Sequence, residues 1–169
     1  RDPGNEEIRE SLESVVEAND LWSIYAEELE GVAEKVDDPL VLGPILFALG
    51  NICITKLGED DKALEVFNRY LKCGHDVPSL VLGASRALES LYATRENHGE
   101  LTRVLSIQLQ YLEDEGKRVD ILRRIGEIQE VHLDAVDDAI RTHLEILDIL
   151  PTDLESIYSL ERLYERAQS

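Results

Sequence analysis

A repeat of 72 to 76 residues constrains the fold of this chain more than any other feature of its sequence. Three copies of one motif begin with Leu-Glu and occupy residues 12–17, 88–93 and 160–165, separated by 76 and then by 72 residues. Between them stand Leu49-Gly50 and Ile125-Gly126, which are also 76 residues apart. A unit that recurs in this way cannot bury its apolar face alone and must stack on its neighbours. The sequence therefore predicts a stack of similar units.

The apolar residues fall at helical spacing along the chain, and no stretch alternates as a strand would. Pro39 to Leu57 is apolar nearly all round, which is typical of a helix buried on two sides. Gly58, Gly74 and Pro151 each end a helix. The predicted helical segments are 5–16, 20–32, 39–57, 63–73, 78–91, 97–112, 121–133, 139–150 and 154–163, and caps are expected at Asn5, Asp20, Asp76, Asn97 and Thr152. We expect an all-α protein of about nine helices, paired as antiparallel hairpins.

Two of the units share a second pattern, in which a glycine is followed by an alanine thirteen residues later. The pairs are Gly50 with Ala63 and Gly126 with Ala139. Phe67 stands four residues after the first alanine, and Pro151 stands twelve residues after the second. This pattern resembles the tetratricopeptide repeat, in a divergent form that lacks the family's tryptophan and has one extra residue between Gly and Ala. The resemblance implies a right-handed α-solenoid of helix hairpins. It also implies that residues 5–169 form a single repeat domain, part of a longer array, after a loose lead-in at residues 1–4.

The chain is strongly acidic, with 36 Asp and Glu residues against 17 Lys and Arg and a formal net charge of −19. This charge argues against sequence-independent binding to nucleic acid or to an anionic membrane, because both need a positive surface. No run of about 18 apolar residues is evident, so we expect no membrane insertion. A basic protein or peptide is the natural complement. Residues 1–38 carry a net charge of −10 and are expected to dominate electrostatic steering.

No constellation of residues predicts catalysis. The sequence holds no Gly-rich phosphate loop and no nucleophile motif. The four histidines, His75, His98, His132 and His143, share no metal-ligand spacing with each other or with the two cysteines. Cys53 and Cys73 are interpreted as small buried hydrophobes or a helix-end thiol rather than as a disulfide. A metal held between His132 and His143 is the one alternative. We expect no enzyme activity, no metal and no cofactor.

The tetratricopeptide resemblance also predicts a binding surface. In such arrays the first helix of each hairpin lines the concave face, and the residues three before and one after each crossing point face it. The crossing points are Val16, Gly50, Tyr92, Gly126 and Tyr164. The predicted groove residues are Glu13, Glu17, Phe47, Asn51, Ile54, Glu89, Ala93, Arg123, Glu127, Glu161 and Glu165. Because six are glutamates, we expect a non-catalytic protein–protein interaction module that binds a basic peptide or protein segment in an acidic groove, with Phe47 and Ile54 as an apolar foothold.

Other interpretations stay open. In the first, the glutamates only keep the helix faces solvated, and the chain is a structural spacer or a self-assembly scaffold. In the second, it is a regulatory domain of a larger protein. Leu160, Leu163 and Tyr164 favour self-association, because they are expected to leave an apolar strip on the last helix. We expect a cytoplasmic location. Since the chain begins at Arg1 without methionine, a removed signal peptide and upstream repeats stay open as alternatives.

Overall fold

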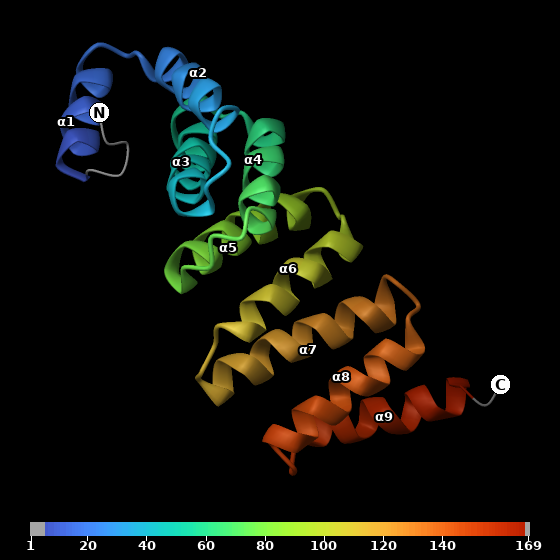
Figure 1. Cartoon of the computed structure of the whole chain (residues 1–169). Helices are drawn as coiled ribbons and strands as arrows, with labels where there is room; N and C mark the ends of the chain where they lie inside the picture. Colours follow the sequence, from blue (N-terminus) through green and yellow to red (C-terminus); the bar gives the residue numbers. More distant parts are fainter. Residues whose placement is uncertain (1–5, 168–169) are drawn as a thin grey trace. The chain divides into compact units, whose positions relative to one another are not determined.

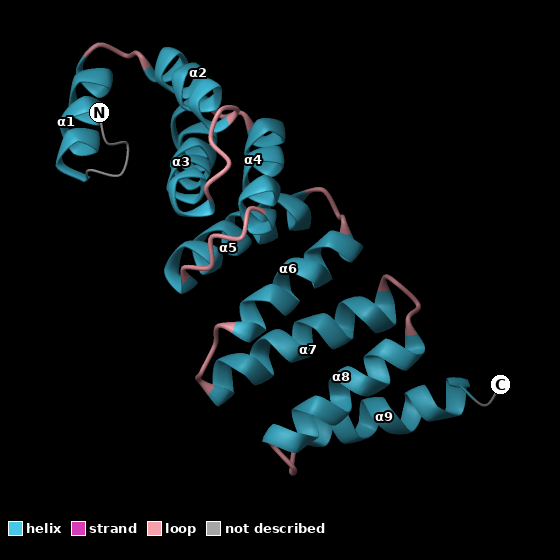
Figure 2. Ribbon diagram, viewed as in Figure 1, coloured by secondary structure: helices cyan, strands magenta, loops and turns pink. Residues whose placement is uncertain are grey.

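The computed structural model of the chain describes the backbone of residues 6–167 and the side chains of residues 11–167. Within that range the chain is all-α, with nine α-helices, one π turn and no strand, as the sequence predicts (Figures 1 and 2). The helices are α1 (Glu6–Ala18), α2 (Trp22–Ala33), α3 (Pro39–Ile52), α4 (Asp60–Lys72), α5 (Pro78–Thr94), α6 (His98–Gln110), α7 (Glu115–Val131), α8 (Val136–Ile149) and α9 (Leu154–Ala167). The π turn η1 (Cys53–Leu57) continues α3 directly.

The chain forms two compact units, Arg1–Leu91 and Tyr92–Ser169, and the boundary falls near the end of α5. Unit 1 therefore contains α1 to α4 and most of α5, and unit 2 contains α6 to α9. Each unit is built from helices that are neighbours in sequence. That both units belong to one continuous repeat domain stays a prediction.

In unit 1, α3 packs against both α2 and α4, which explains why its sequence is apolar nearly all round. Leu46 and Leu49 of α3 and Phe67 of α4 are among its fully buried side chains. Gly50 lies where α3 meets α4. A Cβ atom built on Gly50 would stand 2.7 Å from the Phe67 ring, so only glycine admits this close approach.

In unit 2, α7 packs against both α6 and α8, and α8 packs against α9, so successive helices run back and forth (Figure 1). Gly126 of α7 lies against His143 of α8, with a built Cβ only 3.1 Å from His143 Nε2. Ala139 of α8 is fully buried in a cluster with residues of α9. Gly50 and Gly126 thus stand at helix contacts, as expected of small residues at these positions, while Ala139 packs in a cluster with residues of α9.

The expected apolar strip at the end of the chain is placed differently. Leu160 and Leu163 were expected on an open surface, but they are buried against Ala139 and Ile140 of α8. The exposed apolar side chains of α9 are Leu154, Ile157, Tyr158 and Tyr164. The prediction was wrong because the sequence pattern shows that α9 has an apolar stripe but not which neighbour covers it.

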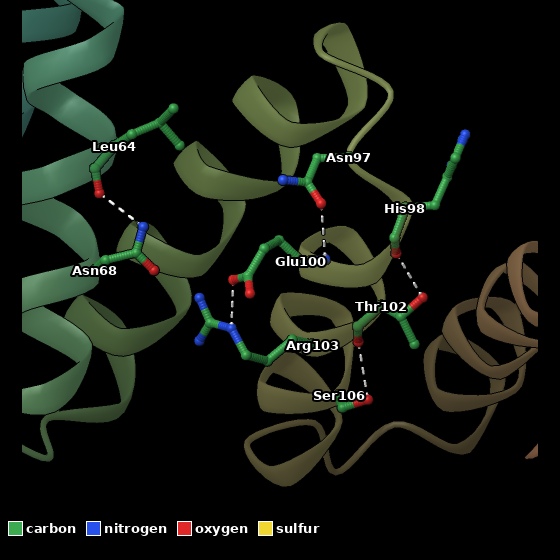
Figure 3. A network of polar contacts seen from close by, with 8 residues as sticks. All are labelled: Leu64, Asn68, Asn97, His98, Glu100, Thr102, Arg103 and Ser106. Atoms are coloured by element: carbon green, nitrogen blue, oxygen red, sulfur yellow. Dashed lines mark hydrogen bonds and ion pairs between the residues drawn. The ribbon is translucent and has the colours of Figure 1, made fainter. Parts of the chain in front are cut away.

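The helix ends agree with the sequence in most places. Asp38 caps α3 and Asp114 caps α7. Gly58 has a φ of 67° and Gly74 a φ of 83°, the left-handed backbone that ends a helix at low cost. Asn97 Oδ1 accepts the Glu100 N–H, which confirms the expected cap at Asn97, and the Glu100 carboxylate accepts a hydrogen bond from Arg103 (Figure 3).

Two expected caps are wrong. Asp20 has a φ of 53° and lies one residue before Leu21, the residue that stands at the start of α2 without a side-chain cap. At α9 the cap is Asp153 rather than Thr152, since Asp153 Oδ2 accepts the Ser156 N–H at 3.0 Å. The expected cap at Asn5 lies outside the described residues. A one-residue shift of this kind is within the usual error for a helix end predicted from sequence.

The segment from Pro39 to Leu57 also corrects the expectation that no membrane-length apolar run exists. As one helical stretch of 19 residues it is long and apolar enough to cross a membrane, by length and composition alone. The buried core helix of a water-soluble protein passes the same test, and 44% of the segment's most apolar window is buried against the rest of the structure.

Candidate functional site: two hollows on the odd-numbered helices

Unit 1 carries a hollow of about 290 Å³, here called the N-terminal hollow. It is lined by Glu13 of α1, Trp22 of α2, Pro44, Phe47, Ala48, Asn51 and Ile52 of α3, Thr55 and Lys56 of η1, and Leu80 of α5. Apart from Trp22, every lining residue comes from an odd-numbered helix or from η1, which extends α3. The lining is largely apolar, with a few polar groups at one side, the composition that is usual for a binding cleft.

A charged cluster borders the N-terminal hollow. Glu17 Oε2 accepts hydrogen bonds from Lys56 Nζ at 2.8 Å and from Trp22 Nε1 at 2.7 Å. These two bonds, first that of Lys56 and then that of Trp22, lower the pKa of the Glu17 carboxyl. The Lys56 ammonium also lies 4.7 Å from the centre of the Trp22 ring, within the range of a cation–π contact. The contacts with Glu17 and Lys56 therefore fix the Trp22 indole beside the hollow, where the side chain is half-buried.

The backbone of α3 and η1 presents the polar side of this hollow. Pro44 has no N–H to donate, so α3 lacks one internal hydrogen bond next to the hollow. The π turn η1 then places Thr55 and Lys56, and the Thr55 hydroxyl donates to the Asn51 carbonyl at 2.8 Å. Asn51 itself also lines the hollow. Single π turns inside α-helices are frequent at functional sites.

Unit 2 carries a second hollow of about 270 Å³, here called the C-terminal hollow. It is lined by Arg123, Arg124, Glu127, Glu130 and Val131 of α7, His143 of α8, and Glu155, Ser159 and Arg162 of α9. It therefore lies on two odd-numbered helices, with one residue of α8 beneath them. Three arginines and three glutamates surround it, so it is charged where the N-terminal hollow is apolar.

Polar contacts among Arg123, Asp153, Ser156 and His143 lie beside and beneath the C-terminal hollow. Arg123 Nη2 donates to Asp153 Oδ1 at 2.5 Å, and His143 Nδ1 lies 3.2 Å from Ser156 Oγ. Burial alone would raise the pKa of Asp153, but hydrogen bonds from Ser156 and Arg123 hold it below its usual range. Burial lowers the pKa of His143, although Glu130 and Glu155 oppose this shift. The carboxylate contacts the serine rather than the imidazole, and Ser156 is fully buried, so this is not the geometry of a nucleophilic triad.

The histidine pair considered as a metal site is not assembled. His132 stacks on His98 instead, with ring centroids 3.8 Å apart, while His143 bonds to Ser156. Within the part of the chain that the structure describes, no three His, Cys, Asp or Glu side chains are arranged to hold a metal ion. Cys53 and Cys73 are both free thiols.

The two hollows contain five of the eleven residues predicted for the groove. Glu13, Phe47 and Asn51 line the N-terminal hollow, and Arg123 and Glu127 line the C-terminal hollow. The six others line neither hollow: Glu17 borders the first through Lys56, Ile54 and Glu89 are half-buried, and Ala93, Glu161 and Glu165 are exposed.

Sequence reasoning missed several residues of both hollows. Trp22 and Lys56 were not predicted for the groove from the sequence, and Lys56 lies on the π turn η1, which a helical pattern does not reveal. Arg124 and Arg162 were not predicted for the groove, although both line the C-terminal hollow. His143 had a usable sign in the sequence, since it takes the place that Phe67 has in the earlier unit, four residues after the alanine.

Unit 2 should lose stability as the pH falls below about 6.5. In the unfolded chain His143 takes up a proton near that pH, whereas in the folded unit its lowered pKa resists protonation. The unfolded state then binds more protons, so the free energy of unfolding falls by at most about 1.4 kcal/mol per pH unit from this group. Asp153 adds a similar loss only in stronger acid, below about pH 3.9.

Urea unfolding at about pH 7.5 and about pH 5.5 measures this effect. His143→Phe should remove the component that belongs to His143, and His132→Gln serves as the control that keeps it. The same pH dependence in the parent and in His143→Phe would contradict the assignment.

No model of a protein family matches the chain, and no curated protein matches it in sequence.

Proposed function

We propose that this chain is a non-catalytic protein-interaction module of the tetratricopeptide type, which binds a segment of another protein along its odd-numbered helices. One observation carries the proposal: most residues that line the N-terminal hollow and the C-terminal hollow belong to odd-numbered helices, the ones that the resemblance assigns to the concave face. Under this proposal the hairpins of both units stack as one right-handed solenoid. The contacts of α2 with α3 and of α3 with α4 in unit 1, and those from α6 through α9 in unit 2, join helices that are neighbours in sequence, as such a stack requires.

The N-terminal hollow fits an apolar anchor of the ligand. Phe47, Trp22, Pro44 and Leu80 offer apolar and aromatic surface, and a space of about 290 Å³ accommodates one large aliphatic or aromatic side chain. The Asn51 amide can both donate to and accept from the ligand's backbone. Anchors of this kind supply most of the affinity of an interface.

Charge supplies steering and register. The net charge of −19 attracts a basic segment, and Glu13 and Glu127 stand in the two hollows to receive its cations. The C-terminal hollow is lined by arginines as well as glutamates, so the groove is not uniformly acidic, in contrast to the expectation from the sequence. Arg162 and Arg123 are already paired, with Glu130 at 2.8 Å and with Asp153 at 2.5 Å, so they balance part of the negative charge rather than reverse it.

A peptide array of basic, neutral and acidic sequences tests the proposal. Basic peptides with one large apolar residue should bind best, and binding should weaken as salt rises, since exposed charges are screened over ~8–10 Å at 0.1–0.15 M ionic strength. The double reversal Glu13→Lys with Glu127→Lys should slow association roughly three- to tenfold. Phe47→Ala should mainly speed dissociation.

A second double reversal provides the matched control. Glu65 on α4 and Glu113 between α6 and α7 are exposed and line neither hollow. Reversing both to Lys changes the net charge by the same amount, so only a general charge effect should remain. If acidic or neutral peptides bind best, or if both double reversals slow association equally, the groove proposal fails.

Self-assembly is the second candidate, and the apolar face of α9 favours it. Leu154 is 62% exposed and Tyr158 is 64% exposed, and Ile157 and Tyr164 extend the same face. Sedimentation at increasing protein concentration should then show a dimer in the parent and a monomer in Tyr158→Glu. The variant Leu163→Glu is unsuitable, because Leu163 is buried within unit 2. A parent that stays monomeric at millimolar concentration would exclude this candidate.

A further inference from the structure

His143 occupies the position where the other unit carries an aromatic packing residue. Phe67 stands four residues after Ala63 and covers Gly50, while His143 stands four residues after Ala139 and covers Gly126. The two side chains thus fill equivalent places in their hairpins. Unit 1 has a fully buried phenyl ring there, and unit 2 has a buried imidazole that also lines the C-terminal hollow. Buried polar side-chain atoms in proteins usually have a hydrogen-bond partner.

The neighbours of His143 determine which ring nitrogen carries the proton. Asp153 Oδ2 accepts the Ser156 backbone N–H at 3.0 Å, and the Ser156 side chain also lowers the pKa of Asp153, so we assign the Ser156 hydroxyl proton to the Asp153 carboxylate. The same hydroxyl oxygen lies 3.2 Å from His143 Nδ1 and must therefore accept from it. This places the proton on Nδ1 and leaves a lone pair on Nε2. Burial keeps the pKa of His143 below its ordinary value, which agrees with a neutral ring at pH 7.

The acceptor atom Nε2 stays without a hydrogen-bond partner among the described residues, because the only side-chain bond of His143 is the one to Ser156. Gly126 keeps it uncovered, since a Cβ at that position would stand 3.1 Å from Nε2. The residue is 5% exposed, so this acceptor lies at the floor of the hollow and not on the open surface.

The groups around Nε2 specify the ligand. A lone pair on a neutral imidazole can accept from a donor. Glu130 and Glu155, whose charges act on His143, and Glu127, which lines the same hollow, favour a donor with positive charge. Glu130 forms an ion pair with Arg162 at 2.8 Å, and Arg123 forms one with Asp153. Glu127 forms no ion pair with another residue that the structure describes. The hollow has a volume of about 270 Å³ and is lined by three arginine side chains, and a compact ammonium group fits this space.

We propose that the C-terminal hollow is a site for a primary ammonium group, such as that of a lysine side chain, which donates to His143 Nε2 while Glu127 supplies the countercharge. The inference rests on the proposed function in assigning this hollow to ligand binding, and it names the ligand group that binds there. It also gives Gly126 a second role beside helix packing, since the glycine leaves the acceptor open. A hydrogen bond of this charged kind is worth roughly ten- to hundredfold in affinity.

The test uses two small cations and needs no knowledge of the natural ligand. Protein with ¹⁵N-labelled histidine is titrated with n-butylammonium chloride at constant ionic strength, and separately with tetramethylammonium chloride, which carries the same charge but no N–H donor. The free protein should show His143 protonated on Nδ1. The His143 Nε2 resonance should then move saturably with n-butylammonium, with an apparent Kd at least tenfold lower than for tetramethylammonium.

Two variants and one control define the site. Gly126→Ala places a methyl group over Nε2, and His143→Phe restores the aromatic residue of unit 1 and removes the acceptor. Both should weaken n-butylammonium binding at least tenfold, followed at the backbone amide of Glu127. Leu144→Ala, on the exposed side of α8, should leave it unchanged. If Gly126→Ala does not fold, His143→Phe alone decides.

Three outcomes would overturn the inference: a proton on Nε2 in the free protein, equal shifts with both cations, or unchanged binding in His143→Phe. These outcomes are separate from those of the peptide array. If peptides bind but n-butylammonium does not shift the His143 resonance, only the ammonium site is contradicted. Binding of n-butylammonium at His143 without any peptide binding would sink the groove proposal alone.

Discussion

Gly50→Ala is expected to lower the free energy of unfolding of unit 1 by roughly 1–3 kcal/mol. The reason is steric, since the added Cβ would stand 2.7 Å from two atoms of the Phe67 ring and 2.9 Å from a third. Phe67 is fully buried and cannot swing away, so α3 and α4 must move apart. Urea or thermal unfolding of the parent and the variant, followed by circular dichroism, measures the change.

Gly31→Ala is the matched control for this prediction. Gly31 also lies inside a helix of unit 1, but nothing stands within 4 Å of a Cβ built there. Alanine should therefore stabilise α2 by about 0.5–1 kcal/mol, because glycine is the poorer helix former. Phe67→Leu should in turn relieve part of the cost of Gly50→Ala in the double variant. If Gly50→Ala and Gly31→Ala shift stability in the same direction, the packing of α3 on α4 is not as described.

Asp153→Ala should destabilise unit 2 by about 2–4 kcal/mol, the sum of a lost helix cap and a lost hydrogen bond to a charged group. Asp153 is 6% exposed, accepts the Ser156 N–H at the start of α9 and holds Arg123 of α7 at 2.5 Å. Without it, the Arg123 guanidinium loses its shortest contact, and the first turn of α9 loses its cap. Amide hydrogen exchange should report faster exchange in α9 than in α8.

Asp120→Ala separates this role from a general loss of negative charge near Arg123. Asp120 also lies near this guanidinium, at 3.7 Å, but its side chain is 74% exposed. An exposed ion pair of this kind contributes little, so the variant should stay within about 0.5 kcal/mol of the parent. Equal destabilisation by Asp153→Ala and Asp120→Ala would show that the buried network does not anchor α9.

Helical periodicity was sufficient to predict the nine α-helices of the described residues. The stripes that predict α3, α7 and α8 come from local spacing, and the positions of Gly50, Gly126 and Ala139 follow from the need for close contact. Periodicity does not show which neighbour covers a stripe. For that reason Leu160 and Leu163 were expected on the surface. Periodicity also does not separate a π turn from an α-helix, so Cys53–Leu57 was expected as ordinary helix.

The candidate site was only partly predictable for a related reason. The resemblance predicted which helix faces carry the site, and Phe47, Asn51 and Glu127, which it placed there, do line the hollows. It did not give the charge balance, since Arg162 reaches the C-terminal hollow from α9 and pairs across to Glu130 of α7. Long side chains of this kind reach several ångströms beyond their own helix, so a list of positions by spacing cannot contain their partners.

Backbone amide shifts on binding of the best peptide from the array test the central claim most directly. In ¹⁵N-labelled protein the largest shifts should fall on odd-numbered helices, at Phe47 and Asn51 of α3 and around Glu127 of α7. Leu64 of α4 and Leu144 of α8, on even-numbered helices and outside both hollows, should hardly move. Shifts concentrated on α4 and α8, with α3 and α7 unchanged, would contradict binding along the odd-numbered helices.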